Sequence, residues 1–102
     1  MSTQDIADKI TKSISHFPYG GAIRRIGVFG SQASGTARPE SDIDLLVEFD
    51  PSTPIGLFEL VALKKQLEAA LNHPVDLLTP DSISHYLKTD IERHTKIIYE
   101  RP

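Results

Sequence analysis

The sequence contains no cysteine among its 102 residues. This absence excludes disulfide-bonded scaffolds, thiol nucleophiles and cysteine-ligated zinc sites. No run of apolar residues approaches the ~18 that a membrane-spanning helix needs, and the first residues, MSTQD, do not form a signal peptide. A basic excess is missing too, because 14 acidic residues outnumber 11 basic ones and give a net charge of -3. We therefore expect a cytoplasmic protein that binds neither membranes nor nucleic acid directly.

Repeats, low-complexity tracts and linkers are also missing from the chain. The composition, 39% apolar and 25% charged, is that of a folded soluble domain and is too apolar for a disordered chain. Because domains of about 100–150 residues are the commonest size, residues 1–102 are expected to form one domain.

The spacing of apolar residues predicts three helices. The first covers residues 3–17, where isoleucines fall four apart. The second covers residues 54–72, with Thr53 as its N-cap and a proline at its first position. A third begins at residue 81 or 82 and ends near His94. The supporting apolar residues are Ile6, Ile10, Ile14 and Phe17 in the first helix, Leu57, Leu60, Val61, Leu67 and Leu71 in the second, and Ile83, Tyr86, Leu87 and Ile91 in the third.

Four short segments are predicted to be strands. They cover residues 23–29, 42–49, 75–78 and 97–99, where β-branched, aromatic and other large apolar residues gather. The alternation of helices and strands indicates an α/β (α+β) domain with a small mixed sheet that is covered by helices on one face. The other face of the sheet is then open.

Two aspartates are predicted to lie on that open face. Asp42 and Asp44 alternate with apolar residues of the 42–49 strand, so their carboxylates point the same way, about 6–7 Å apart. Such carboxylates repel each other unless a cation lies between them, which favours a site for magnesium. Asp76 would add a third carboxylate if its strand pairs beside this one, and three carboxylates can hold two metal ions. The alternative is a solvated polar face of an edge strand.

The segment that precedes these aspartates suits phosphate binding. Gly30 and Ser31 follow the 23–29 strand, and Ser31 is able to cap a short helix through about Ala37. The free amides at such a helix start bind anions, and a glycine lets the backbone approach a ligand closely. A phosphate site would then lie beside a metal site, as nucleotide chemistry requires.

The combined pattern resembles a known signature. Gly30-Ser31, ten intervening residues and Asp42-Ile43-Asp44 are similar to the signature of the polymerase-β-type nucleotidyltransferase superfamily. The segment GVFGSQASGTARPESDIDLLVEF resembles one branch in particular, the minimal nucleotidyltransferases (MNT). Members of this branch occur in prokaryotes as antitoxins beside HEPN-domain toxins. The resemblance implies a polymerase-β-like core fold.

The resemblance also implies a role for each matching residue. Gly30 and Ser31 would grip the triphosphate of ATP, and Asp42 and Asp44 would bind two Mg2+ ions. Asp76 would bind one of these ions and help to activate the attacking hydroxyl. The implied reaction moves AMP from ATP onto a hydroxyl group of a HEPN ribonuclease toxin and releases pyrophosphate.

One position departs from the pattern of the family. Many relatives have an arginine where this chain has Ser34, whereas Arg38 matches a second family arginine and is expected to contact the nucleotide. The departure keeps a second function open, in which the protein is a non-catalytic antitoxin that neutralises its toxin by covering the toxin's active site.

Overall fold

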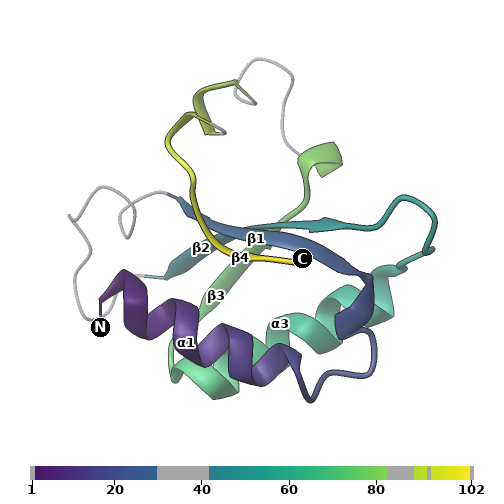
Figure 1. Ribbon diagram of the computed structural model, residues 1–102, viewed down its shortest axis with the longest axis horizontal. Helices are drawn as coiled ribbons and strands as arrows, with labels where there is room; N and C mark the ends of the chain where they lie inside the picture. Colours follow the sequence, from purple (N-terminus) through teal and green to yellow (C-terminus); the bar gives the residue numbers. More distant parts are fainter. Residues whose placement is uncertain (1, 30–41, 83–88, 92, 102) are drawn as a thin grey trace.

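The computed structural model describes residues 2–29, 42–82, 89–91 and 93–101 (Figure 1). Its elements, in chain order, are α1 (Thr3–Ile14), the short 3-10 helix η1 (Gly20–Ala22), β1 (Ile23–Phe29), β2 (Ile43–Phe49), α3 (Leu57–Leu71), β3 (Val75–Leu78), the 3-10 helix η2 (Pro80–Ser82) and β4 (Lys96–Glu100).

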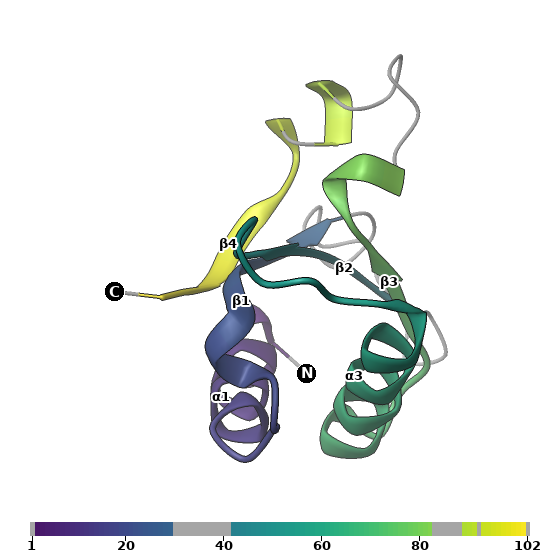
Figure 2. The ribbon, with the colours of Figure 1, turned by 90° about the vertical axis from the view of Figure 1, so that its right-hand side faces the viewer.

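The described strands form one four-stranded sheet in the order β3-β2-β1-β4. β1 pairs antiparallel with both β2 and β4, whereas β2 and β3 are parallel and are connected through α3. Both α1 and α3 lie against the same face of the sheet, as the two views in Figures 1 and 2 agree. This mixed sheet with helices on one face confirms the predicted fold class.

The hydrophobic core lies between the sheet and the two helices. Ile26 and Val28 of β1 pair with Val47 and Leu45 of β2, and all four side chains are fully buried. Because alternate residues of a strand point to opposite faces, Asp44 lies on the face away from the helices. The helices contribute Ile6, Ile10 and Ile14 from α1, and Leu63, Leu67 and Leu71 from α3.

α1 begins where the sequence predicted but ends earlier. Ser2 caps the helix, since its hydroxyl accepts a hydrogen bond from the Asp5 amide at 3.1 Å while the Asp5 carboxylate accepts one from the Ser2 amide at 3.0 Å. The predicted end at residue 17 is wrong, because the helix ends at Ile14. Pro18 disfavours a helical residue before it, and the Phe17 amide bonds to the Ile14 carbonyl in a tighter turn. Phe17 still packs into the core.

The start of α3 also differs from the prediction. The helix begins at Leu57 with Gly56 as its N-cap, and the Gly56 amide donates to the Glu59 carboxylate at 3.1 Å. Thr53 is not the cap, because its amide donates to the Asp50 carbonyl at 3.0 Å and closes a turn. The chain therefore completes a turn after β2 before the helix can begin.

The apolar stripe predicted for α3 is correct at three of its five residues, and the first of them, Leu60, is partly buried and packs against the core. Leu67 and Leu71 are buried as predicted, and the helix ends at Asn72, which adopts a left-handed conformation with φ of 54°. Leu57 and Val61, however, are exposed. Leu63, which the sequence did not single out, is buried instead.

The strand predictions are confirmed. β1 and β3 have the predicted bounds, β2 begins one residue after Asp42, and β4 extends the predicted 97–99 segment at both ends. The third predicted helix falls largely on residues 83–88 and 92, which lie outside the described residues. Near its predicted start the chain forms η2, and residues 89–91 are helical.

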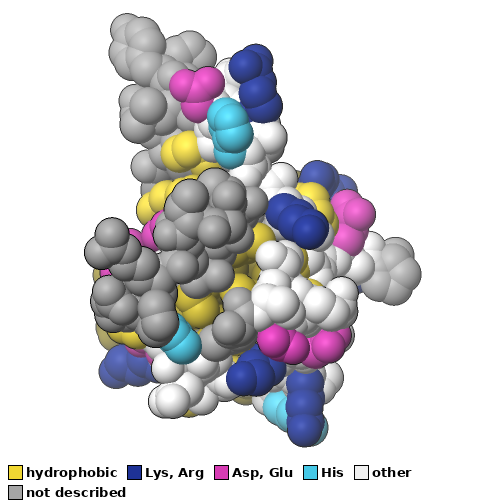
Figure 3. Space-filling model, turned by 90° about the vertical axis from the view of Figure 1, so that its left-hand side faces the viewer, with side chains coloured by type: hydrophobic (Ala, Val, Ile, Leu, Met, Phe, Trp, Pro, Cys, Tyr) yellow, Lys and Arg dark blue, Asp and Glu magenta, His cyan; other side chains and the backbone are white. Residues whose placement is uncertain are grey.

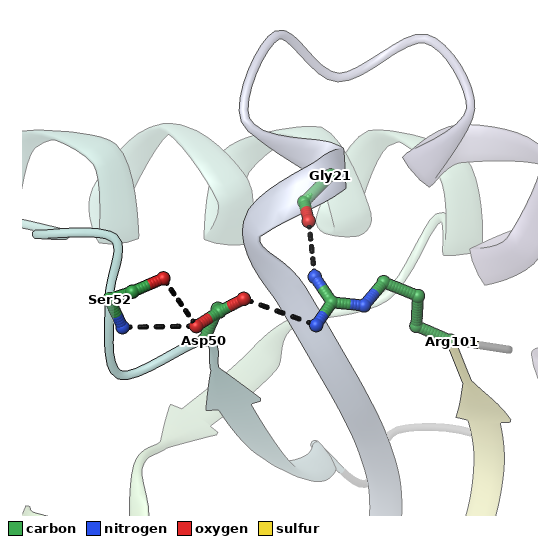
Figure 4. Close-up of polar contacts among 4 residues, drawn as sticks. All are labelled: Gly21, Asp50, Ser52 and Arg101. Atoms are coloured by element: carbon green, nitrogen blue, oxygen red, sulfur yellow. Dashed lines mark hydrogen bonds and ion pairs between the residues drawn. The ribbon is translucent and has the colours of Figure 1, made fainter.

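The C-terminal clamp, defined as Gly21, Asp50, Ser52 and Arg101, ties three distant segments together (Figure 4). The Arg101 guanidinium donates to the Gly21 carbonyl at 2.7 Å and to the Asp50 carboxylate at 3.1 Å. The amide and hydroxyl of Ser52 donate to the other Asp50 oxygen at 3.0 and 2.7 Å. The hydrogen bonds from Ser52, followed by the one from Arg101, lower the pKa of Asp50 to about 2.

Candidate active site

Two of the predicted carboxylates lie side by side on the face of the sheet away from α1 and α3. Asp44 of β2 and Asp76 of β3 are partners in the parallel register. The apolar neighbours of each aspartate along its strand point into the core, so both carboxylates lie on the opposite face. Asp42 comes directly before β2, one strand repeat from Asp44, and is exposed. The condition stated from the sequence, that the 75–78 strand pairs beside the 42–49 strand, is met in the structure.

The environment of Asp44 disfavours its charged form. Partial burial is the largest cause that raises its pKa, and the negative charges of Asp76 and Asp42 raise it further. A side-chain hydrogen bond with Asp76 contributes in the same direction. The charged form of Asp44 is thus less favourable in the folded protein than it would be in water.

No ion pair among the described residues reaches the three aspartates. Among the described residues, the ion pairs are those of Arg25 with Glu48 and Glu100, and of Arg101 with Asp50. None of these pairs includes Asp42, Asp44 or Asp76. Among the described residues, no protein cation is therefore paired with these three carboxylates.

The donor set suits magnesium. No group of three or more Asp, Glu or His side chains among the described residues lies close enough to hold one ion as the side chains stand. Magnesium, however, is usually bound by only one or two carboxylates, together with water and substrate phosphates. The paired Asp44 and Asp76, with Asp42 about 6–7 Å along the strand, meet that requirement.

The predicted phosphate-binding residues follow β1. Phe29, the last residue of β1, is the register partner of Asp44, so the chain leaves the sheet beside this carboxylate. Gly30, Ser31, Ser34 and Arg38 themselves lie outside the described residues, and their roles stay predictions.

A hollow that the sequence did not predict lies at the other end of β2. It has a volume of about 670 Å³ and is lined by residues 47–51 at the end of β2, residues 53, 55–57 and 60 around the start of α3, and residues 79–81 after β3, together with Arg24. Because Asp44 is near the start of β2, this hollow is not part of the carboxylate site.

The described surface carries no dominant basic patch on the side drawn in Figure 3. Described Lys and Arg side chains are scattered there among acidic and polar ones. No helix among the described residues combines the length and the apolar character needed to cross a membrane.

Sequence comparison relates the chain to nucleotide chemistry. It matches the family model described as "Nucleotidyltransferase domain" over residues 7–98, a range that includes all three aspartates. Protein adenylyltransferase MntA of Thermococcus cleftensis is 37% identical over 77 residues, which are 76% of this chain and 74% of that protein. A candidate protein adenylyltransferase of Methanocaldococcus jannaschii, MJ1379, is 42% identical over 71 residues, which are 69% of this chain and 71% of that protein.

Two solved structures that share this fold have related descriptions. A crystal structure of a toxin-antitoxin with AMP-PNP has a TM-score of 0.74 and 27% identity, covering 93% of this chain and 73% of that chain. A structure described as a candidate minimal nucleotidyltransferase has a TM-score of 0.75 and 29% identity, covering 93% of this chain and 94% of that chain.

Proposed function

Because this chain belongs to the nucleotidyltransferase domain family, we propose that it is a protein adenylyltransferase that acts as an antitoxin. It transfers AMP from ATP onto a hydroxyl group of a HEPN-domain toxin and thereby silences that toxin. We further propose that residues 1–102 make up one minimal nucleotidyltransferase domain.

The observation that carries this proposal is the register of Asp44 with Asp76. Two carboxylates meet on the sheet face away from α1 and α3, and a third, Asp42, lies one repeat away. Partial burial, followed by the charges of Asp76 and Asp42, raises the pKa of Asp44, and no ion pair among the described residues includes this carboxylate. This arrangement is unfavourable for an empty polar surface and favourable for a site that binds cations together with phosphate.

The three carboxylates have distinct proposed roles. Asp42 and Asp44 would hold two magnesium ions, and Asp76 would hold one of them. Bound magnesium would neutralise the phosphates and make the acceptor hydroxyl easier to deprotonate. Asp76 orients this hydroxyl and helps to remove its proton. In the transfer, the hydroxyl oxygen bonds to the α-phosphorus of ATP, the bond from that phosphorus to the bridging oxygen breaks, and pyrophosphate leaves.

The remaining nucleotide contacts rest on the sequence resemblance. Gly30 and Ser31 hold the triphosphate through backbone amides and a hydroxyl donor. Arg38 supplies a positive charge to the phosphates, in a chain that has Ser34 where many relatives have an arginine. Since Phe29 pairs with Asp44, the segment that holds these residues starts next to the carboxylates.

The choice of donor and partner is supported by the related proteins. MntA of T. cleftensis is named a protein adenylyltransferase, and the toxin-antitoxin structure at 27% identity was solved with AMP-PNP, an ATP analogue. The identity of the toxin as a HEPN protein rests on the likeness of residues 27–49 to the minimal nucleotidyltransferase branch. Positioning by the partner is expected to supply much of the rate, as in phosphoryl transfer generally.

The test is to incubate the protein with the toxin encoded beside its gene, with ATP and magnesium, and to measure the intact mass of the toxin. The proposal expects one or more added AMP units, and none with the Asp42→Asn variant or with EDTA. If the toxin gains no mass and Asp42→Asn neutralises it as well as the wild type does, the protein is a non-catalytic antitoxin that acts by occlusion.

A further inference from the structure

The hollow at the end of β2 has no part in the reaction proposed above. Its volume of about 670 Å³ is in the range of roughly 300–1,000 Å³ that is usual for binding sites. Figure 2 looks onto this end of the sheet, where η2 and the connection from β2 to α3 lie. The floor of the hollow is apolar, since Val47 is fully buried and both Phe49 and Leu60 pack against the core.

A β-bulge adds an arginine to this hollow. In the antiparallel pairing of β1 with β2, Ile23 is opposite Phe49 and Arg25 is opposite Glu48, so Arg24 is one additional residue on β1. Bulges of this kind change the direction of a side chain and are frequent beside functional sites. The Arg24 side chain lines the hollow and is exposed to solvent.

Two of the charged groups that line the hollow have no partner of opposite charge. The carboxylates of Glu48 and Asp50 are paired with other arginines, at 2.7 and 3.1 Å. No ion pair within the described parts of the chain includes Arg24 or Asp81, although both line the same hollow. One positive and one negative group are therefore left to interact with a bound molecule.

The two unpaired charges lie on opposite sides of β2. Arg24 belongs to β1 and Asp81 follows β3, and these two strands flank β2 in the sheet. Neighbouring strands are about 4.8 Å apart, so the two residues are roughly 10 Å apart across the apolar floor. This pattern is complementary to a segment in which a large apolar side chain lies between an acidic and a basic one.

The openness of the hollow favours a protein over a small molecule. Small ligands usually bury roughly 70–90% of their surface in a pocket. Here Leu57, which forms part of the wall, is 74% exposed, and Arg24 and Asp81 are exposed as well. A side chain that projects from a protein surface can fill such a hollow while the rest of that surface covers its edge.

The hollow is within reach of a protein that is bound at the carboxylates. Four residues of β2 separate Asp44 from Glu48, a distance of about 13 Å along the strand. A standard interface buries about 800 Å² per partner, which is a patch roughly 30 Å across. A toxin that presents a hydroxyl group to Asp44 and Asp76 can therefore cover the hollow in the same complex.

We propose that the hollow is a docking site for the toxin that receives AMP. An apolar side chain of the toxin enters it, an acidic side chain binds Arg24 and a basic one binds Asp81. The inference rests on the proposed function, because that function supplies the toxin as the partner. Arg24 acts here in docking and does not touch the reacting atoms, so it determines how tightly the toxin binds and leaves the chemical step unchanged.

The first test measures the binding of the toxin encoded beside the gene, by calorimetric titration without ATP. Arg24→Ala and Leu57→Ser should each weaken binding by about tenfold, as expected for anchoring residues of an interface. Lys65→Ala and Phe58→Ser are the matched controls, because both residues are exposed on α3 and lie outside the hollow. They should change the affinity by less than about twofold. Normal binding by the hollow variants, or equal losses in the controls, would overturn the proposal.

The second test measures initial rates of AMP transfer at varied toxin and ATP concentrations. Arg24→Ala should raise the KM for the toxin by about tenfold and leave kcat and the KM for ATP unchanged. A raised KM for ATP with normal toxin binding would make the hollow a nucleotide pocket and overturn the docking role. If the toxin binds with the pattern expected in the first test but gains no AMP, the docking site is supported and the proposed reaction is refuted.

Discussion

Replacing Asp44 by asparagine is expected to stabilise the protein in magnesium-free solution. The substitution keeps the shape of the side chain and removes one of the two carboxylates that lie in register across β2 and β3. Because burial and the charges of Asp76 and Asp42 raise the pKa of Asp44, its ionised form is less favourable in the folded protein than in the unfolded chain. Asparagine carries no such penalty.

The size of the gain follows from the position of the pair. Like charges directly opposite each other on neighbouring strands cost roughly 0.2–1 kcal/mol. For a domain of about 100 residues, this range corresponds to an increase in melting temperature of between about 1 and 8 °C. The lower half of the range is expected, because Asp76 is exposed and solvent screens its charge.

The gain in stability of Asp44→Asn over the wild type depends on pH. A raised pKa in the folded state means that the folded protein holds the Asp44 proton more tightly than the unfolded chain does. The stability of the wild type therefore falls as the pH rises through that folded-state pKa. Below the ordinary value of 3.8, Asp44 is protonated in both states and the penalty disappears. The advantage of Asp44→Asn should be full at neutral pH and small below pH about 4.

The assay is thermal unfolding of both proteins in EDTA at pH 7 and at pH about 3.5, followed by titration with magnesium. Asp8→Asn is the control, because Asp8 is exposed on α1 and accepts a hydrogen bond from Gln4 that an amide oxygen can also accept. Magnesium should reverse the order of stability, since a ligand of the native state stabilises the protein that binds it. The reasoning is refuted if Asp44→Asn gives no gain at pH 7, or if its gain persists undiminished at pH 3.5.

Three further predictions concern other parts of the molecule. Ser31→Ala should weaken ATP binding by about 1–3 kcal/mol in calorimetric titration, because the proposed hydroxyl contact is to a charged phosphate. Asp50→Asn should lower the melting temperature at neutral pH, and its difference from the wild type should narrow as the pH falls from about 4 toward 2, because Ser52 and Arg101 hold the pKa of Asp50 at about 2. Gly27→Ala should destabilise the fold by about 1–3 kcal/mol in urea denaturation, because a Cβ there would overlap the Thr95 methyl group.

Each of these has a discriminating control. A covalent adduct trapped on Ser31 would contradict its role as a phosphate contact. Asp50→Asn is compared with the Asp8→Asn control. The difference in melting temperature between Asp8→Asn and the wild type should not narrow as the pH falls from about 4 toward 2. Gly21→Ala is the control for Gly27→Ala, because a Cβ at Gly21 meets nothing within 4 Å and should change stability by less than about 0.5 kcal/mol. Equal effects at both glycines would contradict the packing explanation.

The strands and the carboxylate pair were predictable because their signals are local. Strict alternation in residues 42–49 determines which face Asp44 occupies, and Asp76 lies between apolar residues in the same way. The sequence alone could state the pairing of these two strands only as a condition. Their parallel register depends on α3 packing its leucines against the sheet, which is a tertiary event.

The start of α3 shows where local signals compete. Thr53 followed by Pro54 is a good helix start by propensity. The structure instead uses Thr53 in a turn with Asp50 and starts the helix at Leu57, where Glu59 supplies the capping contact. In the helix that results, Leu57 and Val61 are exposed to solvent. Apolar spacing could not predict this, because it groups both residues with those that pack into the core.

The C-terminal clamp has a practical consequence for how the protein can be tethered. Arg101 is held beside Gly21 and Asp50. The preceding residue, Glu100 of β4, is the register partner of Arg25 in β1, and Arg25 is in turn the register partner of Glu48 near the end of β2. Asp44 lies toward the opposite end of that strand. A linker, dye or solid support attached after Arg101 therefore leaves the molecule at the end of the sheet remote from the carboxylates. Immobilisation through this point should keep the carboxylate face accessible. A short tether that pulls on Arg101 would first strain the hydrogen bonds of Arg101 with Gly21 and Asp50.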